Sequence, residues 1–152
     1  MPYFICPSCG AREQSADRTA GFTTRPRGCS KCGFGFLFEL LDDYYPAPEA
    51  AFFACDGDGR IISTGRGSFE MTGLKEQDVI GRPIKDVLGL SWSQDDLRNG
   101  ADPIETSLEW GVRVLGRKVG VNAEGDLSTS AVADVFPAYD GDGGLLVVLT
   151  PD

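Results

Sequence analysis

The sequence predicts an α+β fold, in which a small all-β metal-binding unit precedes a larger domain with five strands and several short helices. Three observations lead to this prediction. Four cysteines form two CxxC pairs near the start of the chain, and prolines at positions 46 and 48 interrupt it. Two short apolar runs, a helical region and three further apolar runs then follow in that order. The predicted parts are the metal-binding unit at 1–41, a linker at 42–49 and the larger domain at 50–152.

The charge distribution supports a boundary near residue 34. Residues 1–34 hold two acidic residues and five basic ones, namely Arg12, Arg18, Arg25, Arg27 and Lys31. The remaining residues hold nine basic and twenty-one acidic residues, which gives the whole chain a net charge of −9. An acidic domain repels nucleic acid and anionic membranes, so neither is an expected partner.

Composition also limits the location and the chemistry. No apolar stretch is long enough to span a bilayer, and no secretory signal opens the chain, so the expected location is the cytoplasm, where thiols stay reduced. Histidine is absent, which excludes Ser-His-Asp and Cys-His catalytic sets and histidine-bound haem. General acid–base work would fall to carboxylates, lysine or tyrosine. We expect a protein that is not an enzyme.

The cysteine pairs predict a metal site. Residues 6–10 read CPSCG and residues 29–33 read CSKCG. Two residues between cysteines let one tight turn direct both sulfurs to one ion, and each trailing glycine tolerates a positive φ. The predicted ligands are Cys6, Cys9, Cys29 and Cys32. Four thiolates leave no open coordination position, so the ion would be structural. The alternatives are unligated thiols or two disulfides.

This pattern resembles a zinc ribbon. Tyr3–Ile5 would be a strand entering the first cysteine turn, and Phe34, Phe36, Phe38 and Leu40 alternate as in a strand leaving the second. The CPxCG turn is also similar to that of rubredoxins, which hold iron. Rubredoxins have a longer gap between their turns, so zinc is expected rather than iron.

The larger domain begins with a predicted hairpin. Ala51–Cys55 and Arg60–Thr64 read as strands around an Asp-Gly-Asp-Gly turn. Short helices are expected after a cap at Ser68, at 75–80 and at 84–88, and a longer one at Pro103–Trp110 with Gly111 past its end. Three strands close the domain, at 112–121, 130–139 and 145–150, and a second Asp-Gly-Asp-Gly turn joins the last two.

This order resembles the PAS fold, a five-stranded antiparallel sheet with helices on one face. The matching stretches are FFACDGDGRII at 52–62, FEMTGL at 69–74, DVIGRPIKDVLG at 78–89 and VFPAYDGDGGLLVVLT at 135–150. Two departures are that Gly65 or Arg66 stands where the family has Asn, and that Leu74 stands where an aromatic is common. The reactive-cysteine helix of light-sensing flavin domains is also missing, since Gly81–Ile84 stands in its place.

The resemblance implies a space between sheet and helices that binds a small apolar ligand when it is open. We expect a packed or small space, because no histidine or evident cofactor ligand points into it. The residues predicted to line it are Phe53, Ile62, Phe69, Met71, Val79, Ile84, Leu88, Leu108, Val114 and Val132.

Other motifs have simpler interpretations. Both Asp-Gly-Asp-Gly turns lack the first ligand and the final acid of a calcium loop, so they are expected to be hairpin turns. Gly65–Ser68 lacks the Lys-Ser/Thr ending of a phosphate loop. Cys55 is expected to be a small buried apolar residue.

The sequence therefore predicts a cytoplasmic sensor or adaptor with a structural zinc ribbon and a PAS domain that acts through a partner protein or a small apolar ligand. The alternatives are an iron electron-transfer protein and a nucleic-acid-associated zinc ribbon protein. Residues 34–45 are apolar on both faces as a strand, so we expect them to dock the ribbon onto the PAS domain and to support a homodimer.

Overall fold

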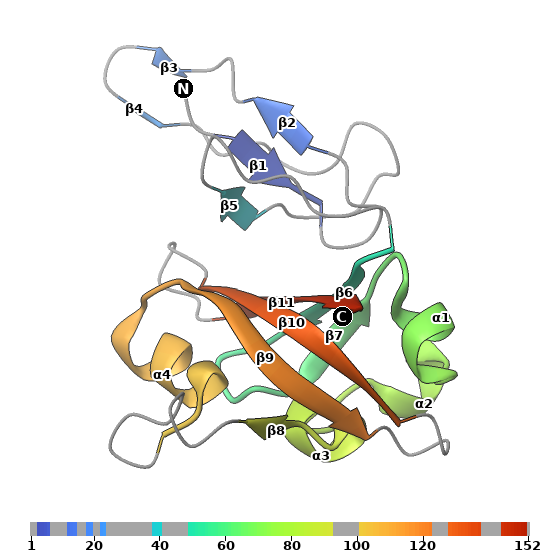
Figure 1. Ribbon diagram of the computed structural model, residues 1–152. Helices are drawn as coiled ribbons and strands as arrows, with labels where there is room; N and C mark the ends of the chain where they lie inside the picture. The colour runs from blue at the N-terminus through green and yellow to red at the C-terminus, as the bar shows by residue number, and fades with distance from the viewer. Residues whose placement is uncertain are drawn as a thin grey trace.

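The computed structural model describes residues 3–6, 12–14, 18–19, 22–23, 38–40, 49–92, 101–122, 128–137 and 144–151. The larger domain is built on an antiparallel sheet with the strand order β7-β6-β11-β10-β9-β8 (Figure 1). The strands are β6 (Ala51–Cys55), β7 (Ile61–Thr64), β8 (Ser91–Trp92), β9 (Val114–Asn122), β10 (Ser128–Pro137) and β11 (Leu145–Pro151).

The sheet has six strands where the sequence predicted five. The additional strand, β8, has two residues, and it extends the sheet by pairing Ser91 with Gly120 and Trp92 with Val119. A two-residue strand is too short to show the alternation that reveals strands in a sequence. The five predicted strands are otherwise present, with ends shifted by one or two residues.

The predicted hairpin joins β6 to β7. The Asp56 carboxylate accepts hydrogen bonds from the backbone N–H groups of Asp58 and Arg60, at 2.9 and 3.0 Å. Gly59 has a φ of 76°, which an aspartate-glycine turn accommodates without strain. The turn is therefore held by its own side chain, as expected of a hairpin. The second Asp-Gly-Asp-Gly turn lies outside the described residues.

Four short helices accompany the sheet: α1 (Ser68–Thr72), α2 (Glu76–Val79), α3 (Ile84–Leu88) and α4 (Pro103–Trp110). The prediction that Ser68 caps α1 is wrong, because the cap is Gly67, with a φ of 81°. A Cβ atom at Gly67 would collide with the carbonyl oxygen of Ala50, so backbone packing requires glycine there. Ser68 instead opens the helix, and its hydroxyl donates to the carbonyl oxygen of Gly65.

One face of the sheet packs against the helices and forms the main core. Phe53, Val147 and Val135 lie directly opposite one another across β6, β11 and β10. They belong to one cluster with Ile84 of α3 and Ile104 of α4. We call this side of the sheet the inner face.

The opposite side, which we call the outer face, is also buried. Its members alternate with the inner residues along the central strands, and each has 0% exposure: Phe52, Ala54, Phe136, Leu146 and Val148. The central strands are therefore apolar on both faces, and their sequences read as continuous apolar runs.

The N-terminal part contains a second small sheet with the order β2-β1-β5. Its strands are β1 (Tyr3–Ile5), β2 (Arg12–Gln14) and β5 (Phe38–Leu40), and a separate pair is formed by β3 (Arg18–Thr19) and β4 (Phe22–Thr23). The strand predicted at Tyr3–Ile5 is confirmed. The strand predicted over 34–40 is confirmed at residues 38–40, and its residues 34–37 lie outside the described residues. Most of the predicted linker at 42–49 also lies outside them.

Candidate functional site

The cysteine region is described only in part. Cys6 is buried and directly follows β1. Ile5 pairs with Arg12 in the antiparallel pair of β1 and β2, and the first CxxC pair lies between these two strands in the sequence. Ile5 also pairs with Phe38, which lies six residues after Cys32. Cys9, Cys29 and Cys32 lie outside the described residues, so the four-thiolate site stays a prediction.

The space between the sheet and the helices is the second candidate site, and seven of its ten predicted residues lie in or against the core. Phe53, Val79, Ile84 and Leu88 are buried there, and Met71, Leu108 and Val114 pack against it. Phe53 comes from β6, and the others come from all four helices and β9. The role of these residues in binding a ligand stays a prediction.

The other three predicted residues lie elsewhere. Ile62 is 43% exposed, because Ile61 is the residue of β7 that joins the inner cluster and Ile62 turns toward solvent. Val132 pairs with Thr150 and alternates with the inner residues of β10, so it belongs to the outer side of the sheet. Since side chains in a strand alternate, choosing the wrong neighbour selects the wrong face.

Phe69 is 54% exposed, although an apolar residue opening a short helix was expected to face the core. Helix α1 instead turns Ser68 and Thr72 inward, which are one helical turn apart. The Thr72 hydroxyl donates to the Ser68 carbonyl oxygen at 2.7 Å, so its polar group is satisfied within the helix. The inward polar pair leaves Phe69 toward solvent.

Two polar groups in this region were not predicted from the sequence. Ser107 of α4 is fully buried, and its hydroxyl has no hydrogen-bond partner among the described residues. The indole N–H of Trp92 on β8 is also buried and without a partner there. Buried groups of this kind normally have a partner, such as a water molecule, a bound molecule or a residue outside the described ranges.

Cys55 lies on the inner face and is buried, as predicted. Burial, together with the negative charge of Asp56, raises the pKa of its thiol from 9.0 to about 12. Thiolates, not thiols, are the reactive form, so the burial and the raised pKa of Cys55 both disfavour reaction at this thiol.

The raised pKa makes stability depend on alkaline pH. Below pH 9 the Cys55 thiol keeps its proton in both states, and its contribution to stability is fully present. Above pH 9 the unfolded chain loses this proton while the folded chain keeps it, so the contribution is lost as pH rises toward 12. We expect Cys55 to lower the free energy of unfolding by about 1.4 kcal/mol between pH 8 and pH 10. Urea titrations of the native protein and of Cys55→Ala at pH 8 and pH 10 measure this loss. If the free energy of unfolding falls equally in both proteins between these pH values, the expectation is contradicted.

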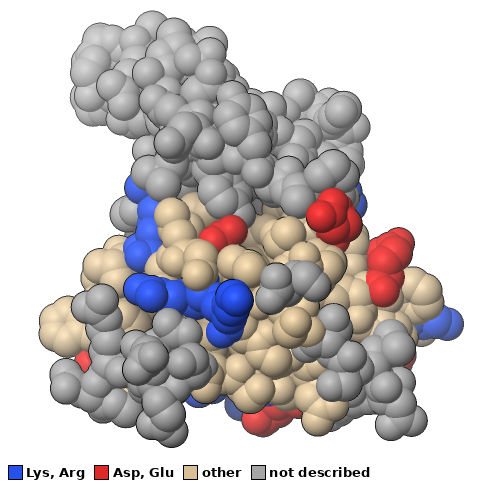
Figure 2. Space-filling model, viewed as in Figure 1, with Lys and Arg blue, Asp and Glu red and all other residues tan. Residues whose placement is uncertain are grey.

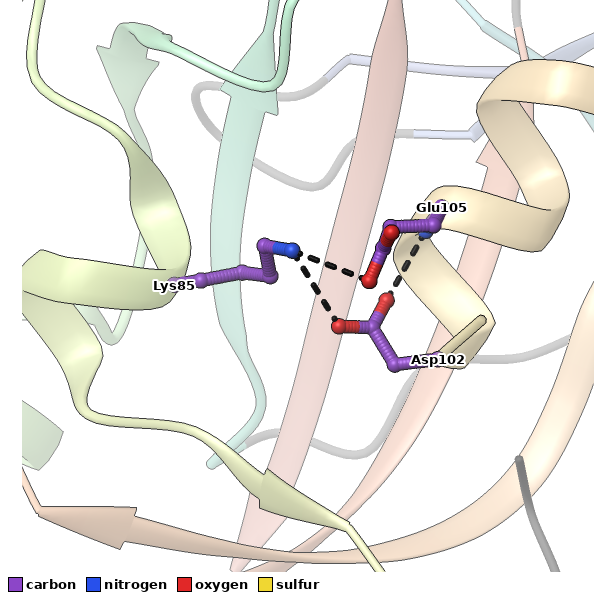
Figure 3. Close-up of polar contacts among 3 residues, drawn as sticks. All are labelled: Lys85, Asp102 and Glu105. Carbon is purple, nitrogen blue, oxygen red and sulfur yellow. Dashed lines mark hydrogen bonds and ion pairs between the residues drawn. The ribbon is translucent and has the colours of Figure 1, made fainter. Parts of the chain in front are cut away.

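A polar cluster joins α3 to the start of α4 (Figure 3). The Lys85 ammonium lies 3.4 Å from Asp102 Oδ2 and 3.1 Å from Glu105 Oε1. Asp102 also caps α4, since its Oδ1 accepts from the backbone N–H of Glu105 at 2.8 Å. This cap was not predicted, although an aspartate directly before Pro103 is a typical helix start.

The pKa values in this cluster shift in different directions. Burial raises the pKa of Asp102, although the Glu105 N–H and the Lys85 charge act against it. Burial alone would lower the pKa of Lys85, but its hydrogen bond to Glu105 and both nearby negative charges raise it. The hydrogen bond from Lys85 lowers the pKa of Glu105. The cluster is partly exposed, so its main effect on stability comes from the cap rather than the ion pairs.

We expect Asp102→Ala to lower the free energy of unfolding by about 1 kcal/mol, because the first turn of α4 loses its cap. Asp102→Asn is the matched control, since it keeps a capping oxygen and removes only the charge. Urea unfolding should show a smaller loss for Asp102→Asn than for Asp102→Ala. Equal losses would assign the effect to the ion pair with Lys85.

The described surface carries charges of both signs. Figure 2 shows Lys and Arg side chains on this face of the larger domain in separate small groups, with acidic side chains among them. A surface of this kind differs from the continuous basic stripe that tracks a nucleic-acid backbone. Among the described residues, no helix has the length and apolar character that a membrane span requires.

No protein-family model and no curated protein matches this sequence. Solved structures do match, and they define the larger domain as a PAS-like fold. The light-state dimer of the fungal blue-light photoreceptor Vivid matches with a TM-score of 0.56 at 15% identity, over 72% of this chain and 82% of that chain.

Two further matches are PAS domains. One, from Colwellia psychrerythraea, has a TM-score of 0.53 at 18% identity and covers 68% of this chain and 86% of that chain. The other, from nitrogen regulation protein NR(II) of Vibrio parahaemolyticus, has a TM-score of 0.51 at 13% identity and covers 68% and 89%. At these identities the likeness establishes the fold, and it confirms the PAS resemblance seen in the sequence.

Proposed function

We propose that this chain is a cytoplasmic signalling sensor or adaptor, in which a structural zinc ribbon is joined to a PAS-like domain that binds a partner protein or a small apolar ligand. The observation that carries the proposal is the PAS-like sheet with its apolar inner face against four short helices. Similar folds include, by their names, a blue-light photoreceptor and a nitrogen regulation protein. A signal leaves such a domain when a ligand or partner shifts it between two arrangements.

Binding rather than catalysis fits the side chains of the interior. It is lined by aliphatic and aromatic residues, and its one titratable member among the described core residues, Cys55, is held neutral. General acid–base chemistry requires a group with a pKa near the working pH, and the thiol of Cys55 does not meet this requirement. We therefore propose that the chain is not an enzyme.

The zinc ribbon is supported by the geometry around β1. The first cysteine pair lies between β1 and β2 in the sequence, and β5 returns beside the end of β1 at which Cys6 lies. A four-thiolate donor set suits zinc, which would supply folding free energy to a unit too small for an apolar core of its own. Cys6, Cys9, Cys29 and Cys32 would hold it.

Native mass spectrometry of the purified full chain tests the proposal. We expect one zinc per chain and no stoichiometric chromophore, because the inner face forms a cluster of buried apolar side chains with no evident cofactor ligand among its described members. A visible absorption band with bound iron would favour the electron-transfer alternative. Salt-dependent retention on DNA or RNA would favour the nucleic-acid alternative. A stoichiometric metabolite would assign the sensor role to the inner space rather than to protein contacts alone.

We further propose a homodimer supported by residues 34–45, whose apolar side chains exceed what a small ribbon can cover. One similar fold was solved as a light-state dimer. Light scattering at micromolar concentration should give the mass of two native chains and of one chain for Leu37→Asp combined with Leu41→Asp. A monomeric native protein would refute the dimer, and a double variant of unchanged mass and stability would refute the role of the segment.

A further inference from the structure

The outer face of the sheet carries an apolar patch on β6, β10 and β11, with Asp134 of β10 at its border opposite Val148. Leu146 of β11 lies directly opposite Ala54 of β6 on one side and Phe136 of β10 on the other. In the next row, Val148 lies opposite Phe52. All five side chains have 0% exposure, so this patch is covered. Arg66 covers part of it, since its guanidinium carbon lies 5.2 Å from the centroid of the Phe52 ring.

The four helices do not account for this burial. Their buried apolar residues, such as Ile84, Val87 and Ile104, belong to the cluster of the inner face. Figure 1 shows β1, β2 and β5 on the other side of the sheet from the helices. The Cα atoms of β5 approach those of β10 within 8 Å, and β10 is the strand that carries Phe136. Strand β5 of the N-terminal part therefore lies against this side of the sheet.

Charge favours the same contact. Residues 1–34 carry a net charge of +3, from five basic and two acidic residues, and the rest of the chain carries −12, from nine and twenty-one. Opposite charges on two units joined by a short linker strengthen docking, and the effect falls as salt rises. Apolar contact and charge thus act in the same direction.

We propose that the outer face is a protein-docking surface whose occupant is the N-terminal unit of the same chain (residues 1–41), seated through β5 on β10. The contact is a specific interface and does not depend on the linker. A partner that binds the outer face must displace this unit, so the unit and the partner compete for the same apolar surface. This inference does not depend on the inner face or on any ligand bound there.

The test uses the full chain with a protease recognition sequence inserted between Pro46 and Ala47. After cleavage in zinc-containing, reducing buffer, size-exclusion chromatography with light scattering measures which pieces remain together. We expect the two pieces to co-elute in a one-to-one ratio with the mass that the uncut chain has in the same buffer. Separate elution would overturn the proposal. At a dilution at which the uncut chain is a monomer, the two pieces should still co-elute; separation there would show that a second copy supplies the occupant, which also overturns the proposal.

Paired variants of the cleavable chain locate the contact. We expect Leu146→Ala, on the outer face, to raise the dissociation constant of the two pieces at least tenfold. Leu145→Ala is the matched control, because Leu145 has the same 0% exposure as Leu146 but lies on the inner face, and it should leave the constant unchanged. Circular dichroism confirms that each variant is folded. If Leu146→Ala is unfolded, Val148→Ala on the same face replaces it. Equal effects of outer-face and control variants would overturn the placement.

Discussion

Replacing Cys9 or Cys32 with serine is expected to abolish metal binding and to unfold residues 1–41, while the PAS-like domain stays folded. A unit of about forty residues cannot bury enough apolar surface to fold alone, and structural zinc supplies about 10–16 kcal/mol to comparable peptides. Elemental analysis should give one zinc per native chain and almost none in either variant. Resonances of β1 and β5 should collapse to random-coil positions, and those of β6 and β11 should remain.

Cys55→Ser is the matched control, because Cys55 lies on the inner face of the larger domain. It should keep a full complement of zinc and lose only stability of the PAS-like domain. Freshly reduced native protein that contains neither zinc nor iron would contradict the metal site. Zinc loss in Cys55→Ser equal to that in Cys9→Ser would contradict the assignment of the four ligands.

Phe53→Ala is expected to have the second largest effect. Phe53 is 2% exposed at the centre of the inner face, in register with Val147 of β11. Truncation of a buried phenylalanine removes its packing and leaves a cavity, which costs about 3–5 kcal/mol. Urea unfolding followed by circular dichroism should show a free energy of unfolding that is lower by this amount. A variant that is already unfolded without urea would also meet the expectation.

Phe69→Ala is the matched control, since Phe69 is the same residue type and 54% exposed on α1. Its loss should change the free energy of unfolding by no more than about 0.5 kcal/mol. Equal destabilisation by the two substitutions would mean that Phe69 packs against the core after all. Together, the two substitutions test whether Phe53 lies in the core and Phe69 lies at the surface.

Several features could be read from the sequence because the forces behind them are local. The turn at Asp56–Gly59, the bounds of α4 with Pro103 and Gly111, and the apolar runs of β6, β9, β10 and β11 follow from short-range rules. The order of these elements was sufficient to indicate the PAS-like fold, which the solved structures confirm. Spacing alone likewise indicated the cysteine ligands, whose test is still to be made.

Other features depended on tertiary contacts. Gly67 rather than Ser68 caps α1 because the carbonyl of Ala50, from another segment, occupies the space a side chain would need. The strand β8 exists only because β9 lies beside it. Residue type could not predict that Ile62 is exposed, because its neighbour Ile61 is equally apolar. The pairing of β7 with β6 places Ile61, and not Ile62, in the core.

For the outer face of the sheet, too, the sequence predicted the strands, and tertiary contacts decided what covers them. The runs AFFAC and LLVVL indicated strands in an apolar environment, and residue type alone determined that much. The residues of a strand cannot predict which segment covers its second face, because that segment lies far away in the chain. Only the approach of β5 to β10 places the N-terminal unit there. The sequence by itself determined the elements and their order, and the tertiary structure decided which faces meet.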